Sequence, residues 1–288
     1  PEQNAFVVQR LVDAGAIALG KTNLDQFATG LVGTRSPYGA PHCVFNAEYV
    51  SGGSSSGSSV AVGAGLAAFA LGTDTAGSGR VPAAINHLIG LKPTRGRWSA
   101  SGLVPACRSL DCITVFANDV ADARLVDSVV AGFDAADAYS RAAPATLIPA
   151  SFRLGVAKET QLNFFGDAQS AALYAAAVER VKAAGATLVE VDIQPLLDCA
   201  QLLYQDAFVA ERLAAIRGFA KSSPGAIHPV VRGIVNGANA FSASDAFDAE
   251  YKRMDYARKA SALWGEIDAL FLPTTPTVYR IAELLAEP

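Results

Sequence analysis

Hydrophobic and polar positions alternate along the chain with two different periods. Over residues 168–184 apolar side chains recur every three or four positions, which predicts an amphipathic helix that stops at Gly185. The next run, Thr187–Val191, is short and rich in β-branched residues, which predicts a strand. Helical and strand patterns of this kind follow one another along the chain, and this alternation predicts a layered α/β fold.

The same two patterns locate the other expected elements. Further helices are predicted at residues 4–14, 57–67, 81–86, 118–131, 197–220 and 244–266. Further strands are predicted at residues 16–19, 68–72, 88–91 and 270–272. Residues 91–112 are expected to be mostly loop, and residues 139–150 to be a connection at the surface.

The composition favours a folded core and argues against several partners. Of the 288 residues 51% are hydrophobic and 17% are charged, which suits a sizeable core and not a disordered chain. The net charge of −4 predicts no basic surface, so nucleic acid is not an expected partner. The most apolar stretch, 60–71, is interrupted by glycines and is shorter than the roughly 20 residues of a membrane span, so no membrane partner is expected.

The cysteines and histidines are too scattered for a metal site. None of the four cysteines forms a CxxC pair, and His42 and Cys43 are adjacent, which is not a ligand spacing. We therefore expect no metal and no cofactor. So few cysteines in a chain of this length are typical of reduced, buried thiols in a cytoplasmic protein.

Two loops rich in glycine and serine stand out, at residues 51–59 and 72–80. Each lies next to the predicted start of a helix, and the second follows a predicted strand. Small residues there allow backbone N–H groups to converge on a bound anion or oxyanion. A serine hydroxyl in such a place becomes a nucleophile when a base lies near it. These loops predict oxyanion chemistry, although Gly/Ser runs are also typical of flexible linkers.

Two other motifs compete for the same loops. Residues 72–77 have the glycine spacing of a phosphate-binding loop, but Ser78 follows where that loop needs a lysine, which disfavours a nucleotide site. Residues 53–57 match the G-x-S-x-G nucleophile elbow, with Ser55 at the centre. An elbow needs a histidine later in the chain, and His228 fits that order although it precedes a proline. An elbow hydrolase therefore stays an alternative.

Four motifs occur in a fixed order: Gly20-Lys21-Thr22-Asn23, Gly52-Gly53-Ser54-Ser55, the run from Gly72 to Ser78, and Lys92-Pro93-Thr94-Arg95-Gly96. Together they resemble the amidase signature family, strongly over about residues 5–130 and more loosely beyond. Within that family, residues 27–39 and 107–112 look most like allophanate hydrolases. The resemblance implies an α/β fold with a mixed β-sheet flanked by helices.

The resemblance also implies a Ser–cis-Ser–Lys triad. By position Ser78 is the acylated nucleophile and Ser54 is the bridging serine, preceded by a cis peptide bond. The backbone N–H groups of Thr75, Ala76, Gly77 and Ser78 are implied to form the oxyanion hole. From the residues alone, Ser78 is also explained as the N-cap of the helix that begins near Gly79, a role that is compatible with that of the nucleophile. For Ser54 the loop alone favours an ordinary turn serine.

One part of the family's machinery is expected to be missing. The catalytic lysine of the family lies upstream of the motif at 20–23, and Lys21 and Lys92 are interpreted as structural. We therefore expect residues 1–288 to be a single amidase signature domain that is truncated at both ends and that carries the nucleophile without the base.

The implied reaction is hydrolysis of a small amide or urea C–N bond through a serine acyl-enzyme, with allophanate giving ammonia and carbon dioxide. The substrate carboxylate calls for an arginine, and the resemblance implies Tyr204 and Arg212. On one predicted helix, residues 202–217, the two would be about 80° apart and could face one cleft. The alternative for Arg212 is a surface ion pair with Asp206.

Other arginines and other functions remain open. Arg35 is a second choice for the substrate, and Arg80 is expected to brace the nucleophile loop. The expected partners are a small-molecule amide and a second copy of the chain in a homodimer. The alternatives are another amidase, an amidotransferase-type subunit, or a non-catalytic homologue that lacks the lysine.

Overall fold

The computed structural model describes residues 2–142 and 151–288, which form two compact units. Each unit has its own sheet and core and is described by itself. The first unit consists of residues 2–142, Glu211–Val235 and Val278–Pro288, and the second of residues 151–210 and Asn236–Thr277.

A three-stranded antiparallel sheet forms the centre of the first unit. Its strands are β1 (Phe69–Asp74), β2 (Ile89–Leu91) and β3 (Cys112–Ala117), in the order β1-β3-β2. Every residue of β3 is buried, because β3 is the central strand and both of its faces are covered. The predictions of β1 and β2 are confirmed. β3 was not predicted, because its run falls between the loop expected at 91–112 and the helix expected at 118–131.

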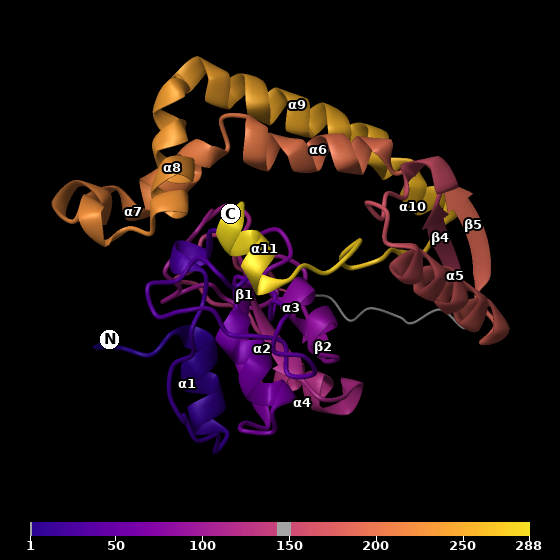
Figure 1. Cartoon of the computed structure of the whole chain (residues 1–288), viewed down its shortest axis with the longest axis horizontal. Coiled ribbons are helices and arrows are strands. Elements are labelled where there is room, and N and C mark those ends of the chain that lie inside the picture. Colours follow the sequence, from indigo (N-terminus) through magenta and orange to yellow (C-terminus); the bar gives the residue numbers. More distant parts are fainter. Residues whose placement is uncertain (1, 143–150) are drawn as a thin grey trace. The chain divides into compact units, whose positions relative to one another are not determined.

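Helices cover both faces of this sheet (Figure 1). The odd-numbered residues of β3 pack in one cluster with α1 (Phe6–Asp13) and α4 (Val120–Val130). Phe116 points to the other face and packs against α2 (Ser56–Gly63) and α3 (Arg80–Ile85). All four helices confirm predicted ones within a few residues. This packing fixes the end of β1 and the start of α3, between which the second Gly/Ser loop lies.

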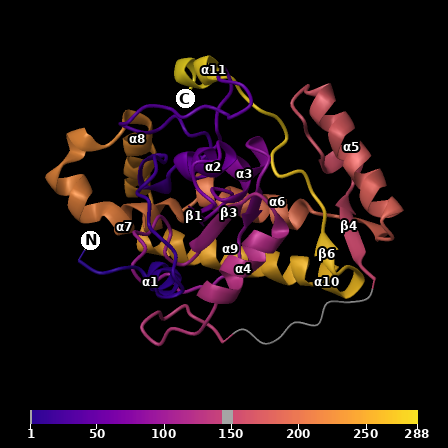
Figure 2. The same ribbon diagram turned by 90° about the horizontal axis from the view of Figure 1, so that it is seen from below.

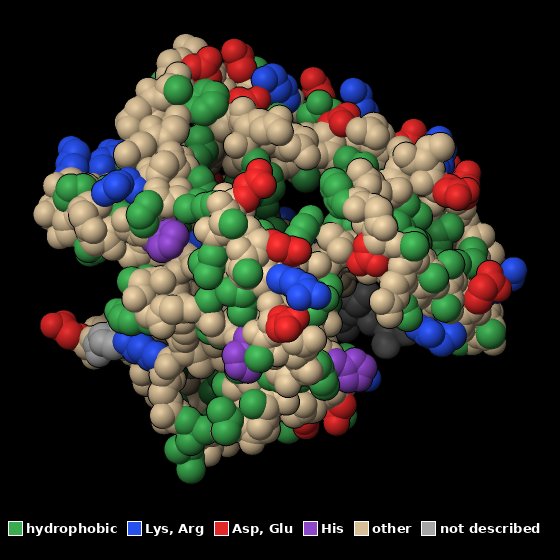
Figure 3. Space-filling model, in the orientation of Figure 1, with side chains coloured by type: hydrophobic (Ala, Val, Ile, Leu, Met, Phe, Trp, Pro, Cys, Tyr) green, Lys and Arg blue, Asp and Glu red, His purple; other side chains and the backbone are tan. Residues whose placement is uncertain are grey.

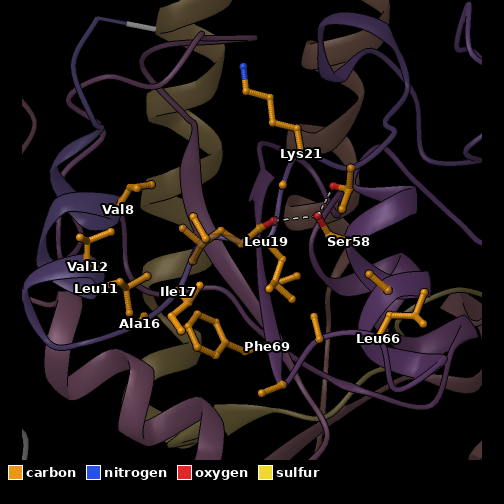
Figure 4. Close-up of a pocket in the computed structure, with 18 of the residues that line it drawn as sticks. Val8, Leu11, Val12, Ala16, Ile17, Leu19, Lys21, Ser58, Leu66 and Phe69 are labelled. Atoms are coloured by element: carbon orange, nitrogen blue, oxygen red, sulfur yellow. Dashed lines mark hydrogen bonds between the residues drawn. The ribbon is translucent and has the colours of Figure 1, made fainter.

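The segment 16–19 is not a strand, contrary to the prediction. It pairs with no strand among the described residues, and Ile17 is 84% exposed. A groove of about 910 Å³ lies between this segment and β1, and most of its lining is apolar (Figure 4). Lys21 extends away from these apolar side chains. The apolar run has strand propensity, but propensity forms no ladder without a neighbouring strand.

The second unit is built on a parallel sheet of order β5-β4-β6. Its strands are β4 (Arg153–Ala157), β5 (Thr187–Val191) and β6 (Ala269–Leu270), and α5 (Ala168–Ala183) connects the first two. α5 ends as predicted before Gly185, which has a φ of 98°. β4 follows the predicted connection at 139–150, of which residues 143–150 lie outside the described residues, and the sequence did not predict this strand.

One predicted helix proves to be two. The helix expected at 197–220 is α6 (Gln194–Gln205) followed by α7 (Val209–Ser222), because Asp206 is extended. The Asp206 carboxylate accepts the N–H of Ala207 at 2.8 Å and the Lys252 ammonium at 2.7 Å. These bonds compete with helical backbone bonding at this point. The argument that placed Tyr204 and Arg212 about one helix axis is therefore wrong.

The helix that supplies Lys252 lies alongside α6 (Figures 1 and 2). It is α9 (Ala243–Ser261), and α10 (Leu263–Glu266) follows it where one helix was predicted to continue to 266. Basic and acidic side chains are mixed over this part of the surface (Figure 3). The remaining helical segments are α8 (Pro229–Gly237), α11 (Ile281–Ala286) and four short 3-10 turns, at Gln26–Ala28, Glu159–Gln161, Pro224–Ala226 and Ala238–Ala240.

The α/β fold class predicted from the sequence is confirmed. Antiparallel and parallel strand pairs both occur, in separate sheets, and helices flank them. Across residues 2–142 and 151–288, no helix has both the length and the apolar character that a bilayer crossing requires.

Candidate active site

The two Gly/Ser loops of the first unit meet beside β1. The N–H of Ser55 donates to the carbonyl oxygen of Ser78 at 3.3 Å. The Ser55 hydroxyl donates to Thr73 O at 3.2 Å and accepts the N–H of Thr73 at 3.1 Å. Ser55 is thus buried and bound to β1, which contradicts its role as the nucleophile of an elbow.

Asp74 fixes the loop that carries Ser78. This fully buried carboxylate accepts the N–H of Gly77 at 2.7 Å and that of Gly79 at 3.1 Å. The Arg80 guanidinium donates to both of its oxygens, at 2.8 and 2.9 Å, which confirms that Arg80 braces the loop. Burial alone would raise the pKa of Asp74, but the bonds from Arg80 and from the loop outweigh it and hold the pKa below its usual value.

The predicted oxyanion donors divide into two groups. In the described part of the chain, the N–H groups of Thr75, Ala76 and Ser78 have no protein acceptor. The N–H of Gly77 is instead directed at Asp74, which makes it a brace of the loop and not an open donor. The Gly77 φ of 131° is one that few side-chain-bearing residues adopt. Three amide donors without a protein acceptor among the described residues therefore lie on the loop from Thr75 to Ser78.

Ser78 lies at the start of α3 but does not cap it. The N-cap residue is Gly79, and no side chain caps this helix end. Ser78 is nearly buried, with 3% of the residue exposed. Its hydroxyl makes one long contact within the described ranges, 3.4 Å to the carbonyl oxygen of Gly30. The N-cap interpretation of Ser78 is wrong, and its hydroxyl is held only weakly.

Ser54 is fully buried and follows a cis peptide bond from Gly53, as the resemblance implied. Among the described residues its hydroxyl has no hydrogen-bond partner. The backbone around it is held by Asp25, whose N–H donates to Ser54 O at 2.9 Å. A Cβ on Gly53 would lie 2.2 Å from Asp25 Oδ2, so no larger residue fits there. The backbone of this serine is fixed while its hydroxyl is unsatisfied.

The Asp25 carboxylate orders the loop that faces Ser54. It accepts the N–H of Gly33 at 3.0 Å and that of Arg35 at 2.9 Å. Burial raises the pKa of Asp25 despite these bonds and the nearby Arg35 charge. The Arg35 Nε is itself buried, with no partner in the described residues.

Arg212 contacts the segment just before Gly30 within the first unit. It is 7% exposed, and its Nη1 donates to Thr29 Oγ1 at 3.2 Å and Ala28 O at 3.5 Å. The next residue, Gly30, is the one whose carbonyl accepts the Ser78 hydroxyl. The predicted alternative, an ion pair with Asp206, is wrong, since Asp206 binds Lys252.

The charge of Arg212 has no anionic partner within the described ranges. The Arg212 charge acts on the thiol of Cys107. Burial raises the pKa of this thiol to about 12, and the opposing effect of the Arg212 charge is smaller. Cys107 is therefore neutral at ordinary pH and does not compensate the guanidinium. A nearly buried arginine without a carboxylate is the expected environment for a bound anion.

Tyr204 and Lys92 belong to other segments of the chain. Tyr204 is on α6 in the second unit and is 55% exposed. Lys92 donates to Pro93 O at 3.0 Å and contacts the thiol of Cys112, which agrees with its interpretation as a loop residue. The described residues contain no cluster of three or more His, Cys, Asp or Glu side chains that could hold a metal.

Sequence reasoning missed the buried aspartates that shape the loops. Asp74 and Asp25 were not singled out, and neither was Asp111, which accepts the Thr75 hydroxyl at 2.5 Å. Burial raises the pKa of Asp111 in spite of that bond. A signal was available for Asp74, because it ends an apolar strand and is followed by glycines at 77 and 79, a setting in which a carboxylate accepts loop amides.

Comparison with known proteins gives one family. The family model described as Amidase matches residues 1–280. Urea amidolyases from Lachancea kluyveri and Saccharomyces cerevisiae are 48% and 46% identical to the whole chain, which spans 16% of each of them. The chain therefore corresponds to a small part of these relatives.

Two solved structures show the same fold. The allophanate hydrolase of Kluyveromyces lactis is 48% identical and superposes with a TM-score of 0.97 over the whole chain, which covers 48% of that structure. A glutamyl-tRNA(Gln) amidotransferase structure from Thermotoga maritima is 27% identical, with a TM-score of 0.82 over 98% of this chain and 63% of its own.

Proposed function

Because the chain belongs to the amidase family, we propose that it hydrolyses a small amide or urea C–N bond through an acyl-enzyme on Ser78, with allophanate as the substrate. One observation carries the proposal: a weakly held serine hydroxyl lies on a loop whose open amide donors are fixed in place by the buried Asp74. Donors fixed in advance stabilise developing negative charge without reorganisation during the reaction.

The first step is attack of Ser78 Oγ on the substrate carbonyl carbon. The carbonyl oxygen becomes an oxyanion, which the N–H groups of Thr75, Ala76 and Ser78 would bind. Each such donor is typically worth about 3 kcal/mol in the transition state. The Gly77 N–H holds the loop through Asp74 and takes no direct part. Collapse of the intermediate breaks the C–N bond, releases ammonia once the nitrogen is protonated, and leaves the acyl-enzyme for water to hydrolyse.

The proton of Ser78 needs an acceptor, because a serine hydroxyl is too weak an acid to ionise unaided. We assign the relay to Ser54, whose buried hydroxyl is unsatisfied and can both donate and accept. In the family the terminal acceptor is a neutral lysine, an amine whose pKa must fall well below its ordinary value of about 10.4. We propose that such an amine docks on Ser54 Oγ in the active protein.

The preference for a carboxylated substrate rests on Arg212. Its guanidinium is nearly buried, carries no ion pair in the described residues and contacts the segment that binds Ser78. The relatives named urea amidolyase and allophanate hydrolase support allophanate, a urea with one carboxylate. The contribution of Tyr204, in the second unit, stays a prediction, as does a homodimer. The four cysteines are unpaired thiols, which supports a cytoplasmic location.

The substrate assignment is tested by comparing allophanate with biuret, in which a carboxamide replaces the carboxylate. In the native protein, Arg212→Ala should lower kcat/KM for allophanate by about 100-fold, since it removes a charge-assisted contact of ~2–3 kcal/mol, and should change biuret turnover by less than about threefold. Arg217→Ala, an exposed arginine on the same helix, is the matched control and should change neither. Equal losses on both substrates would show that Arg212 is structural.

A further inference from the structure

The residue before Arg212 makes the strongest contacts at the start of α7. Both carboxylate oxygens of Glu211 are used: Oε1 accepts the N–H of Ser109 at 2.7 Å, and Oε2 accepts the Ser109 hydroxyl at 2.6 Å. Both bonds are to a charged acceptor, the stronger class of hydrogen bond. Glu211 also lies in the first helical turn, where the helix dipole favours an acidic residue.

Arg212, by contrast, makes only long contacts in the part of the chain that the structure describes. Its bonds to Thr29 and Ala28 measure 3.2 and 3.5 Å. Successive residues on a helix are about 100° apart, so Glu211 and Arg212 leave α7 in different directions and reach two different loops. The short contacts of Glu211 therefore fix the rotation of the first turn, and with it the direction of the Arg212 guanidinium.

The loop at residues 106–111, which Glu211 binds through Ser109, also contacts Thr75. Asp111, two residues after Ser109, accepts the N–H groups of Ala106 and Cys107 at 2.8 and 3.1 Å. The same carboxylate accepts the hydroxyl of Thr75 at 2.5 Å. Residues 106–111 thus form a rigid connection between Thr75 at one end and Glu211 at the other, all within the first unit.

We propose that Glu211 is a positioning residue for substrate specificity. Its two bonds to Ser109 hold the Arg212 guanidinium in a fixed position relative to the loop at 75–78. This position sets the preference for a substrate that carries a carboxylate. The inference rests on the proposed function. Glu211 touches no reacting atom. It acts through Arg212, and its loss should affect binding of the charged group more than the chemical step.

The test is Glu211→Gln in the native protein, assayed with allophanate and with biuret. The neutral amide has one acceptor oxygen and cannot replace the carboxylate in both bonds from Ser109. KM for allophanate should therefore rise about tenfold, while kcat should change by less than about twofold. KM for biuret should stay within about twofold. Glu283→Gln is the matched control, because Glu283 also lies in the first turn of a helix of this unit and accepts a backbone N–H, that of Arg280 at 2.8 Å. It should alter neither substrate.

Two further variants keep the test decisive if Glu211→Gln folds poorly. Ser109→Ala removes one of the two bonds and should give a smaller rise in KM for allophanate, about threefold. The double variant Glu211→Gln/Arg212→Ala should be no worse on allophanate than Arg212→Ala alone, because Glu211 acts through Arg212.

The outcomes separate the inference from the function on which it rests. Equal losses on allophanate and biuret, additive losses in the double variant, or an unchanged KM for allophanate would each overturn the role of Glu211. If the native protein releases no ammonia from allophanate, the proposed function fails first, whatever the variants do.

Discussion

The two Gly/Ser loops differ in how completely their polar groups are satisfied. In the loop after β1, the Asp74 carboxylate accepts the backbone N–H groups of Gly77 and Gly79. The N–H groups that have no acceptor among the described residues are those of Thr75, Ala76 and Ser78. In the loop before α2, Asp25 also fixes the backbone, but the hydroxyl of Ser54 is buried without a partner in the described residues. The first loop therefore offers amide donors, to which we assign the oxyanion, and the second offers a buried hydroxyl without a partner, to which we assign the proton relay.

This difference separates two contributions to catalysis. Stabilisation of an oxyanion depends on donors held in advance, and the described residues supply both the donors and their braces. Proton transfer depends on a base of suitable pKa within hydrogen-bond reach. Substitutions in the two loops should therefore give different combinations of lost activity and lost stability.

The largest effect is expected from Ser78→Ala. Removing the proposed nucleophile should lower kcat/KM for allophanate by about 10⁴-fold or more, measured as ammonia release by the variant relative to the native protein. The melting temperature should stay within about 2 °C, because among the described residues the hydroxyl makes a single long contact, 3.4 Å to Gly30 O. Retained turnover would remove Ser78 from the mechanism.

Ser54→Ala should have the second-largest effect on activity, and it should lower activity without lowering stability. Loss of the relay should lower kcat by about 10²–10⁴-fold. The free energy of unfolding should not fall, because an unsatisfied buried hydroxyl costs about 1–3 kcal/mol that alanine avoids. Urea unfolding checks the second expectation. A variant that is less stable but fully active would make Ser54 a structural turn residue.

Asp74→Asn should lose both properties. The neutral amide cannot accept both the Arg80 guanidinium and the loop amides, so kcat should fall by about 100-fold and the free energy of unfolding by about 3 kcal/mol. Asp127→Asn is the matched control, because Asp127 binds the Arg97 guanidinium through both oxygens elsewhere in the same unit. That variant should lose stability and keep kcat. Equal kcat losses in the two variants would contradict a specific role for Asp74.

The smallest effect concerns pH. Burial raises the pKa of Asp111 in the folded protein, so folding favours its protonated form. Its contribution to stability is fully present below the unfolded pKa of about 3.9 and is lost as the pH rises through the higher folded value. Asp111→Asn removes this titration. Thermal melts from pH 4 to 7 should therefore show a flatter pH dependence in the variant than in the native protein, and parallel curves would contradict the prediction.

Local sequence patterns predicted the strand, loop and helix that carry the site, but they did not predict its buried polar side chains. The strand–loop–helix unit around Ser78 is continuous in sequence, so apolar periodicity and glycine spacing were sufficient to place it. Asp25, Asp74 and Asp111 look like surface residues in sequence, because their burial depends on amides and hydroxyls that the fold brings to them. Nothing local in the sequence distinguishes Asp25 and Asp111 from exposed aspartates, whereas Asp74 has one local signal, the apolar strand before it and the glycines after it.

Two errors in the predicted elements have a similar cause. The break between α6 and α7 depends on Lys252, which is 46 residues from Asp206 in sequence. The segment 16–19 has the composition of a strand but pairs with no strand in the described residues. Both elements depend on groups beyond their own sequence, a lysine for the break at Asp206 and a neighbouring strand for the segment 16–19, and local patterns do not supply these.

The most direct test of the central claim is to label the native protein with a phosphonyl fluoride and map the modified peptide by mass spectrometry. The account predicts one adduct, on Ser78, that forms in the native protein and is lost in Ser78→Ala. It also predicts slow labelling in Ser54→Ala, where the relay is missing. An adduct on Ser55, or labelling that persists without Ser78, would contradict the account.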